Sequence, residues 1–267
     1  MPEPPPTDDA QSGPRPGTAA WWLAREDRPT LQRRRRLLTL DAILDAAMAL
    51  LDADGPGALT MRNVAEALGC RPAALYNHVR DREELVTLLG DRAVSVASTP
   101  PPPDLDWADQ AAWSAREFRA HLLRHPGLVS LLRGTERGGP NSLAGHEYAL
   151  ELFTGAGLSP RLASAAASAL ATFIVGSVQF NLGLDASDPD ERRHRRLLYG
   201  SRDAAHAPLL VRHADVLAEV DGDDEFEVGL AALLTGFREL IGRDAPLSRL
   251  NEVGVHGGRE QRKRQTR

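Results

Sequence analysis

The sequence is poor in the residues that build disulfide scaffolds, zinc clusters and membrane spans. Among its 267 residues there is one cysteine, Cys70, and there are three methionines. This excludes a disulfide framework and a zinc site made of several thiolates. The longest apolar stretch, residues 169–178, is far shorter than the ~20 residues of a membrane-spanning helix. The first twenty residues lack the apolar run of a secretory signal. We therefore expect a cytoplasmic protein without membrane contact.

Neither positive nor negative charge is in large excess over the whole chain. The formal net charge is −5, so composition alone does not mark a nucleic-acid-binding protein. Four consecutive arginines nevertheless stand together, namely Arg33, Arg34, Arg35 and Arg36. Such a run is either a solvated charge cluster or an arm that follows DNA phosphates or enters the minor groove. We favour the arm, because the run immediately precedes a helix–turn–helix pattern.

That pattern, LTMRNVAEALGCRPAALYNHV over residues 59–79, predicts two short helices joined by a tight turn. Thr60 suits the N-cap of the first helix, and Gly69 supplies the left-handed residue that ends it. Pro72 fits the first position of the second helix, where no backbone N–H is needed. Ala73 and Ala74 give this helix a small front with polar side chains at its edges, which favours insertion into a major groove. The same arrangement also occurs as a plain packing unit.

The longer run LTMRNVAEALGCRPAALYNHVRDREELVTLL resembles the DNA-binding domain of the TetR family of bacterial transcriptional regulators. The signals are LT before one helix, A-x-x-L-G at its end, then L-Y-x-H-V and a D-R-E-E-L entry into a further helix. The resemblance is specific over residues 38–98. It continues weakly to residue 183, through WADQAAWSAREFRAHLLRHPGL, which is similar to the effector domain of the tetracycline-repressor branch. It implies an all-α homodimer that binds a palindromic operator in double-stranded DNA and a small-molecule effector.

The resemblance and major-groove geometry assign roles to single side chains. Arg62, Arg71 and Asn77 are expected near base edges, where arginine can bind guanine bidentately. Pro72 and Ala73 are expected against a thymine methyl group. Phosphate contacts are expected from Tyr76, His78, Arg82 and the backbone N–H at Thr60. The rival hypothesis is a helical adaptor or binding protein in which the helix–turn–helix only packs, without salt-dependent affinity for DNA.

Apolar periodicity predicts an all-α protein with two helical domains. Residues 1–36 are expected to be a disordered extension with the basic arm, on which two adjacent tryptophans pack back against the body. Residues 37–99 form the helix–turn–helix domain, residues 104–243 a helical effector-binding and dimerisation domain, and residues 244–267 a disordered basic tail. We expect one short helix within residues 185–224. The helices over 161–182 and 226–241, the latter including Phe237, have apolar faces that the resemblance places in a four-helix bundle between subunits.

Five residues of the second domain are candidates for a ligand pocket. Trp113, Ser114, Phe118 and His121 lie close together on its first helix, and Tyr148 can face them from a neighbouring one. Aromatic residues of this kind suit a pocket and a plain core equally, and the sequence leaves both open. A pocket built from them offers a hydroxyl, one imidazole and no full charge. It favours a flat, hydrophobic, uncharged or weakly polar effector.

No pattern for catalysis, a cofactor or a metal is present. The chain has no Gly-rich phosphate loop, HExxH or G-x-S-x-G motif, so we expect no enzyme. His121 and His125 are four apart on one predicted helix, but no carboxylate stands beside them to complete a metal site. Tetracycline-responsive members of the family hold a magnesium–drug complex with two histidines, whose positions here are occupied by Leu132 and Ser98. The sequence therefore predicts an effector other than tetracycline.

Overall fold

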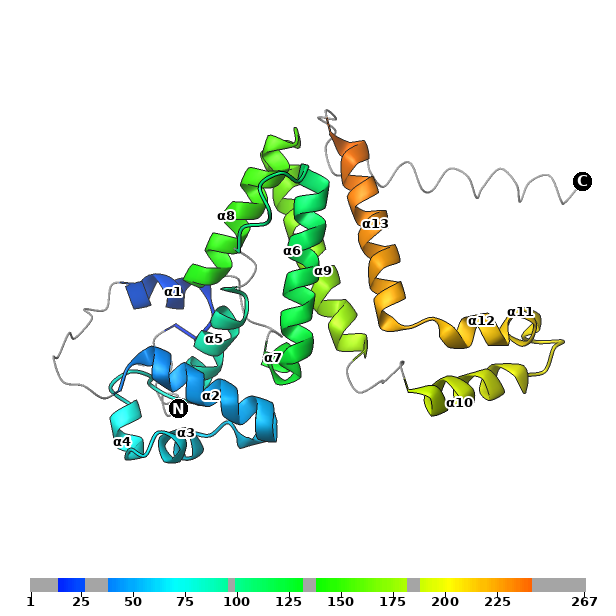
Figure 1. Cartoon of the computed structure of the whole chain (residues 1–267). Helices are drawn as coiled ribbons and strands as arrows, with labels where there is room; N and C mark the ends of the chain where they lie inside the picture. The colour runs from blue at the N-terminus through cyan, green and yellow to red at the C-terminus, as the bar shows by residue number, and fades with distance from the viewer. Residues whose placement is uncertain (1–13, 27–37, 96–98, 132–137, 182–187, 242–267) are drawn as a thin grey trace, which may run out of the picture.

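The computed structural model describes residues 14–26, 38–95, 99–131, 138–181 and 188–241. Within these ranges all regular elements are helices and no strand occurs, which confirms the all-α prediction. Figure 1 shows the helices. They are α1 (Ala19–Glu26), α2 (Leu40–Asp54), the 3-10 turn η1 (Pro56–Ala58), α3 (Met61–Ala67), α4 (Pro72–Leu75), α5 (Arg82–Ala93), α6 (Trp107–Arg124), α7 (Pro126–Leu131), α8 (Pro140–Gly155), α9 (Pro160–Asn181), α10 (Pro189–Gly200), α11 (Pro208–Arg212), α12 (Ala214–Glu219) and α13 (Gly222–Leu240).

Side-chain caps begin three of the N-terminal helices, α2, α3 and α5. The Thr39 hydroxyl accepts a hydrogen bond from the N–H of Ala42 and caps α2, and the Thr60 hydroxyl caps α3 in the same way, both at 3.1 Å. Gly69 has a φ of 62°, the left-handed conformation expected after α3. Asp81 caps α5 by accepting from the N–H of Glu84 at 2.8 Å. These caps set the angles at which the short helices pack around α2.

The C-terminal helices α6, α8, α9 and α13 enclose a second apolar core. α9 is long and apolar enough, by length and composition, to cross a membrane. Its seven buried residues, from Leu162 to Val178, instead pack in this core, so α9 is the central helix of a folded domain. Phe153 of α8 makes edge-to-face contact with Phe237 of α13, with ring centroids 5.6 Å apart.

Two expectations about the connecting segments are wrong. Residues 19–26 of the supposedly disordered extension form α1, because Trp21 and Trp22, 2% and 7% exposed, are buried on the N-terminal core. Residues 189–219 form three helices, α10, α11 and α12, and not one. These three pack mainly on one another and extend from the body as an arm (Figure 1). Residues 33–36 of the basic arm and the tail from 244 lie outside the described residues.

The two cores are joined at the N-terminus of α8. Asp91 on α5 is only 8% exposed. Its carboxylate accepts four hydrogen bonds, from the backbone N–H and side-chain amide of Asn141 and from the backbone N–H and hydroxyl of Ser142, at 2.9–3.2 Å. Two of the donors are first-turn N–H groups of α8, which have no partner inside their own helix. Gly139 makes this contact possible, since a Cβ there would lie 2.2 Å from Asp91 Oδ1.

We predict that Gly139→Ala destabilises the protein by about 1–3 kcal/mol, because the Asp91 carboxylate must leave its four donors to make room. Urea unfolding followed by circular dichroism measures the change. Gly155→Ala is the matched control at the other end of α8, where an added Cβ meets open space. It should be neutral or stabilising by up to about 1 kcal/mol. Equal stability of both variants would show that the Asp91 contact does not hold α8.

Candidate DNA-binding surface and ligand cavity

Helices α3 and α4 are anchored by their inner faces and present polar residues to solvent. Val64 and Leu75 are fully buried in the N-terminal core. The expected base-contacting residues Arg62, Arg71, Pro72, Ala73 and Asn77 are exposed, and Tyr76 is 54% exposed. The guanidinium groups of Arg62 and Arg71 form no hydrogen bond or ion pair with any part of the chain that the structure describes. The pattern thus gathers the predicted DNA-binding residues on one accessible surface.

Two features of this surface differ from the sequence-based expectation. Helix α4 ends at Leu75, and Tyr76, Asn77 and His78 continue as a turn in which the N–H of His78 donates to the Leu75 carbonyl at 2.8 Å. Arg82, expected on a phosphate, donates from Nε to the Leu59 carbonyl at 2.7 Å and from Nη2 to the Pro56 carbonyl at 3.3 Å. Its guanidinium therefore also fixes the chain just before α3.

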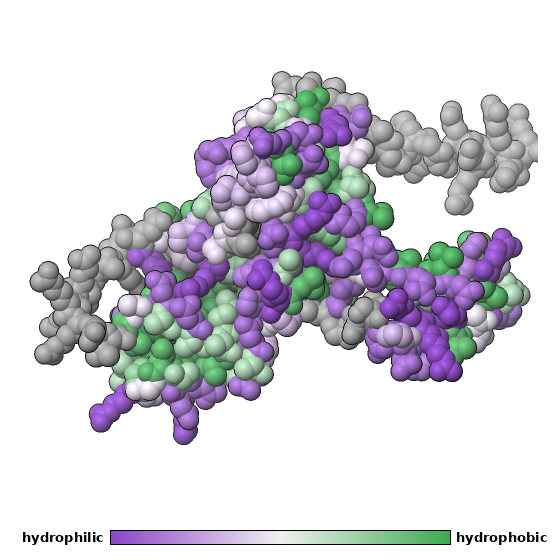
Figure 2. Space-filling view, viewed as in Figure 1, coloured by the Kyte–Doolittle hydropathy of each residue, from purple (hydrophilic) through white to green (hydrophobic). Residues whose placement is uncertain are grey.

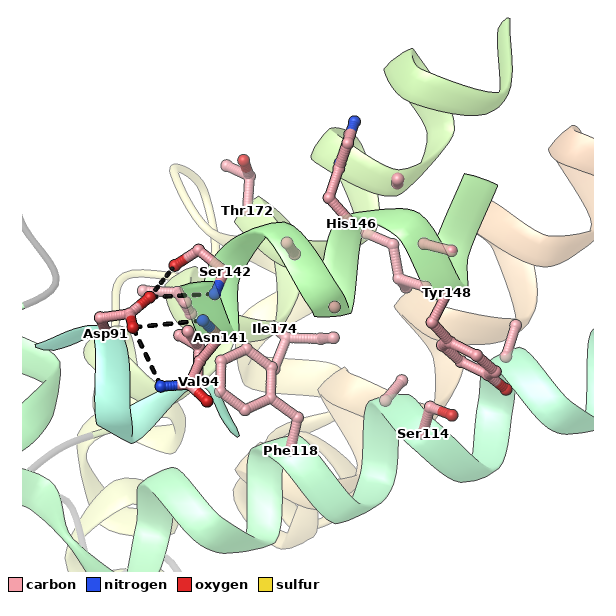
Figure 3. Close-up of a pocket in the computed structure, with 18 of the residues that line it drawn as sticks. Asp91, Val94, Ser114, Phe118, Asn141, Ser142, His146, Tyr148, Thr172 and Ile174 are labelled. Atoms are coloured by element: carbon pink, nitrogen blue, oxygen red, sulfur yellow. Dashed lines mark hydrogen bonds between the residues drawn. The ribbon is translucent and has the colours of Figure 1, made fainter. Parts of the chain in front are cut away.

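A cavity of about 380 Å³ lies between the two cores, with walls from α1, α5, α6, α8 and α9. Its central part is apolar, with Phe118 of α6 and Ile174 of α9 close together in Figure 3. Of the five predicted ligand-binding residues, Ser114, Phe118 and Tyr148 line the cavity, whereas Trp113 and His121 do not. The Trp113 side chain lies on a different side of α6 from Ser114 and Phe118. Whether the three lining residues bind a ligand stays a prediction.

Two groups of polar residues lie at opposite ends of the cavity, and the polar residues His146 and Thr172 lie apart from both (Figure 3). At one end Asp91, Asn141 and Ser142 form the hydrogen bonds that join α5 to α8. At the other end are Ser114 and Tyr148, whose hydroxyl oxygens are buried and have no hydrogen-bond partner among the described residues. The cavity wall therefore does contain a full charge, contrary to the sequence-based expectation, but the Asp91 carboxylate is already saturated by four donors.

Sequence reasoning missed several lining residues: Trp22, Asp91, Asn141, Ser142 and His146. They come from α1, α5 and α8, which are far apart in the chain, so no spacing pattern connects them. His121 lies instead beside His125, with ring centroids 4.8 Å apart. Burial, reinforced by the nearby His125 and Arg124, lowers the pKa of the His121 imidazole below its ordinary value. Within the described ranges no group of three or more His, Cys, Asp or Glu side chains could hold a metal ion.

An exposed helix–turn–helix surface in one domain, combined with a ligand-sized cavity next to that domain, defines a class of protein, the one-component DNA-binding regulators. Comparison with known proteins agrees. Residues 43–89 match the family model of bacterial regulatory proteins of the tetR family, and residues 99–241 match the tetracyclin repressor-like C-terminal domain. The second match alone covers more than half of the chain. The chain belongs to the TetR family, and it is a ligand-responsive, DNA-binding transcriptional regulator.

Individual relatives support the same assignment over most of the chain. An HTH-type transcriptional regulator of Saccharopolyspora erythraea is 31% identical over 80% of this chain and 91% of that protein. The HTH-type transcriptional repressor DrrR1 of Streptomyces coeruleorubidus is 30% identical over 78% of this chain and 82% of its own length. Among solved structures, the TetR family protein ActR of Streptomyces coelicolor in complex with actinorhodin superposes with a TM-score of 0.68. It is 30% identical, and the match covers 79% of this chain and all of that one.

We predict that Arg62→Ala weakens binding to a cognate duplex by about 1–3 kcal/mol and relaxes the preference at one base pair, because Arg62 is exposed and unpaired near the groove-facing helices. A duplex selected by the wild-type protein from a random pool provides the cognate site. Fluorescence anisotropy against this duplex and a scrambled one measures both effects.

Arg82→Ala is the comparison variant, and it should weaken both duplexes alike and lower the melting temperature. The guanidinium of Arg82 holds two carbonyl groups before α3, and the same residue is a predicted phosphate contact. If Arg62→Ala also weakens both duplexes to the same degree, Arg62 contacts the DNA backbone and not a base.

Proposed function

We propose that the protein is a homodimeric repressor that binds a palindromic operator and releases it when a flat, hydrophobic small molecule fills the cavity. The observation that carries this proposal is the position of the cavity. Residues of α5, the last helix of the DNA-binding domain, form part of its wall. A ligand at this position touches both domains. It can shift operator occupancy only if it binds one arrangement of the two domains better than the other.

DNA binding is favoured over the rival adaptor hypothesis by the residues left free on α3 and α4. A packing unit would bury or pair its long polar side chains, whereas Arg62, Arg71 and Asn77 are exposed. We propose these three as base-contacting residues, with Pro72 and Ala73 at a thymine methyl group. Tyr76, His78, Arg82 and the N–H of Thr60 are the proposed phosphate contacts. The proposed site of action is the cytoplasm, where the operator is accessible, and no catalytic step is part of this function.

The dimer is supported by an apolar face shared by α9 and α13. Phe180 on α9 is 84% exposed and Val228 on α13 is 72% exposed. The small residues Ala165 and Ala169 of α9 are also exposed, and they allow the close approach of a helix from a second subunit. Phe237 does not belong to this face, although its register suggested it. It is 7% exposed and packs on Phe153 inside the subunit.

We predict that Phe180→Glu converts the dimer into a folded monomer, because it places a charge in the proposed contact between subunits. Sedimentation velocity gives the mass, and circular dichroism checks that the helices remain. Leu23→Glu is the control, since Leu23 is a similarly exposed apolar side chain on α1. Phe237→Arg should instead unfold the subunit. A stable Phe180→Glu dimer would place the interface on another face.

The effector class follows from the cavity lining. Phe118, Phe153 and Ile174 offer broad apolar surfaces, and the unpaired hydroxyl groups of Ser114 and Tyr148 offer weak polar contacts. The only lining carboxylate group in the described ranges, that of Asp91, is saturated. This lining favours a flat polycyclic ligand over a metal-bound drug or a sugar phosphate. The crystallised complex of ActR with actinorhodin supports the proposal that this chain also binds a small molecule.

We predict that polycyclic aromatic compounds release the bound operator, whereas tetracycline with magnesium and sugar phosphates do not. Release is measured as the loss of fluorescence anisotropy of a labelled operator. Ala149→Phe narrows the cavity and should abolish release while operator binding persists. Ala120→Phe makes the same change on the exposed side of α6 and should behave as the wild type. Release by the magnesium complex alone, unaffected by Ala149→Phe, would rule out this cavity as the effector site.

A further inference from the structure

Helix α1 lies outside both family matches, which begin at residue 43, yet it contacts both domains. Figure 1 places α1 beside α5 and the N-terminal end of α8, away from α3 and α4. Trp22 makes the contact with the second domain, because a Cβ added to Gly138 would lie 2.7 Å from Trp22 Cδ1 and 3.3 Å from its Cγ. The edge of the indole therefore packs on the backbone just before α8.

Helix α1 is attached firmly to α5, the last helix of the DNA-binding domain. Trp21 is 2% exposed and belongs to the N-terminal core. Arg25 pairs with Glu84 of α5, a fully buried residue whose carboxylate also accepts from the N–H of Arg80 at 2.9 Å. Withdrawal of Arg25 would leave this buried carboxylate without its cation, which is strongly unfavourable. Trp22 therefore moves together with the DNA-binding domain.

The chain before α8 is thus held by the DNA-binding domain at two successive residues. Gly139 lies against the Asp91 carboxylate of α5, and Gly138 lies against the Trp22 indole of α1. The hydrogen bonds of Asp91 converge on one carboxylate, and a contact centred on one group restricts rotation less than two separate contacts do. The indole supplies the second contact. Together the two contacts restrict the angle between the DNA-binding domain and α8.

We propose that Trp22 is a positioning residue, which sets this angle through Gly138 and thereby the half-site spacing that a dimer binds. The inference rests on the proposed dimeric, operator-binding function. The spacing of two half-sites mirrors the separation of the two domains that read them, so a change of angle in each subunit changes the preferred spacing. Because α1 lies away from α3 and α4, Trp22 acts on orientation and not on contacts with bases or phosphates.

The test compares three duplexes by fluorescence anisotropy. They are the operator selected by the wild-type protein from a random pool, the same operator with two base pairs inserted between its half-sites, and a single half-site. Trp22→Ala should weaken binding to the selected operator about 5-fold or more, the lower end of typical coupling between distant sites. It should also reduce the preference for the selected over the lengthened operator. The affinity for the single half-site should not change, because the helix–turn–helix is untouched.

Gly138→Ala disturbs the same contact from the other side without removing a core side chain. Gly138 has no positive φ, so the indole is the obstacle to the added methyl group. This variant should also weaken binding to the selected operator and not to the half-site. In the Trp22→Ala background it should have no further effect, since the contact is already lost. Gly155→Ala adds a Cβ to open space at the other end of α8 and should bind as the wild type.

Thermal unfolding followed by circular dichroism shows which variants are folded at the assay temperature, and Gly138→Ala decides the question if Trp22→Ala is not folded. Equal weakening on the operator and the half-site, or additive effects of the two substitutions, overturns the positioning role. Unchanged operator binding in the folded variants overturns it too, while the proposed function stands. If the wild-type protein selects no operator, the proposed function fails and this inference fails with it.

Discussion

The hydrogen bonds between the Asp91 carboxylate and the N-terminus of α8 hold the two halves of this protein in register. A buried carboxylate is tolerated only when its oxygens are paired, and here two side-chain donors and two backbone N–H groups meet that need. The N-terminus of a helix also carries partial positive charge, which favours an anion at this position. Because a Cβ at position 139 would overlap the Asp91 carboxylate, glycine at this position permits the contact. Helices α5 and α8 therefore move together or the contact is lost.

This constraint makes the cavity sensitive to the DNA-binding domain. The residues of α5 that line it, among them Thr87 and Gly90, belong to the helix that follows the helix–turn–helix. A second polar contact ties the two domains together. His125 Nδ1, at the end of α6, lies 2.8 Å from Asp52 Oδ2 of α2. Helix α7 also packs on α2 and α5 near this second contact, so we propose that a ligand that separates α5 from α8 tilts the DNA-binding helices about this region. Such a tilt changes the spacing of two DNA-binding domains in a dimer.

The fold was predictable wherever the decisive interaction is local. Thr60 caps α3 through a backbone N–H three residues away, and Gly69 needs only its own backbone conformation, so sequence alone locates these ends. The cavity depends on contacts between segments far apart in the chain, which no spacing reveals. Periodicity likewise shows that Phe237 is buried, but not whether the subunit or a partner buries it. The structure assigns it to the core of the subunit.

Helices α10, α11 and α12, which extend from the body as an arm, also leave apolar side chains on the surface. Hydrophilic residues dominate its visible face, with hydrophobic residues along its rim (Figure 2). Leu197, Leu209 and Val216 are each more than half exposed, and helices this short gain little stability of their own. Arg196 of α10 pairs with Asp215 and Glu219 of α12, and these ion pairs join the two helices. An arm built in this way leaves its apolar rim free to pack against the second subunit of the proposed dimer, so dimerisation would stabilise more of the chain than the α9–α13 face alone.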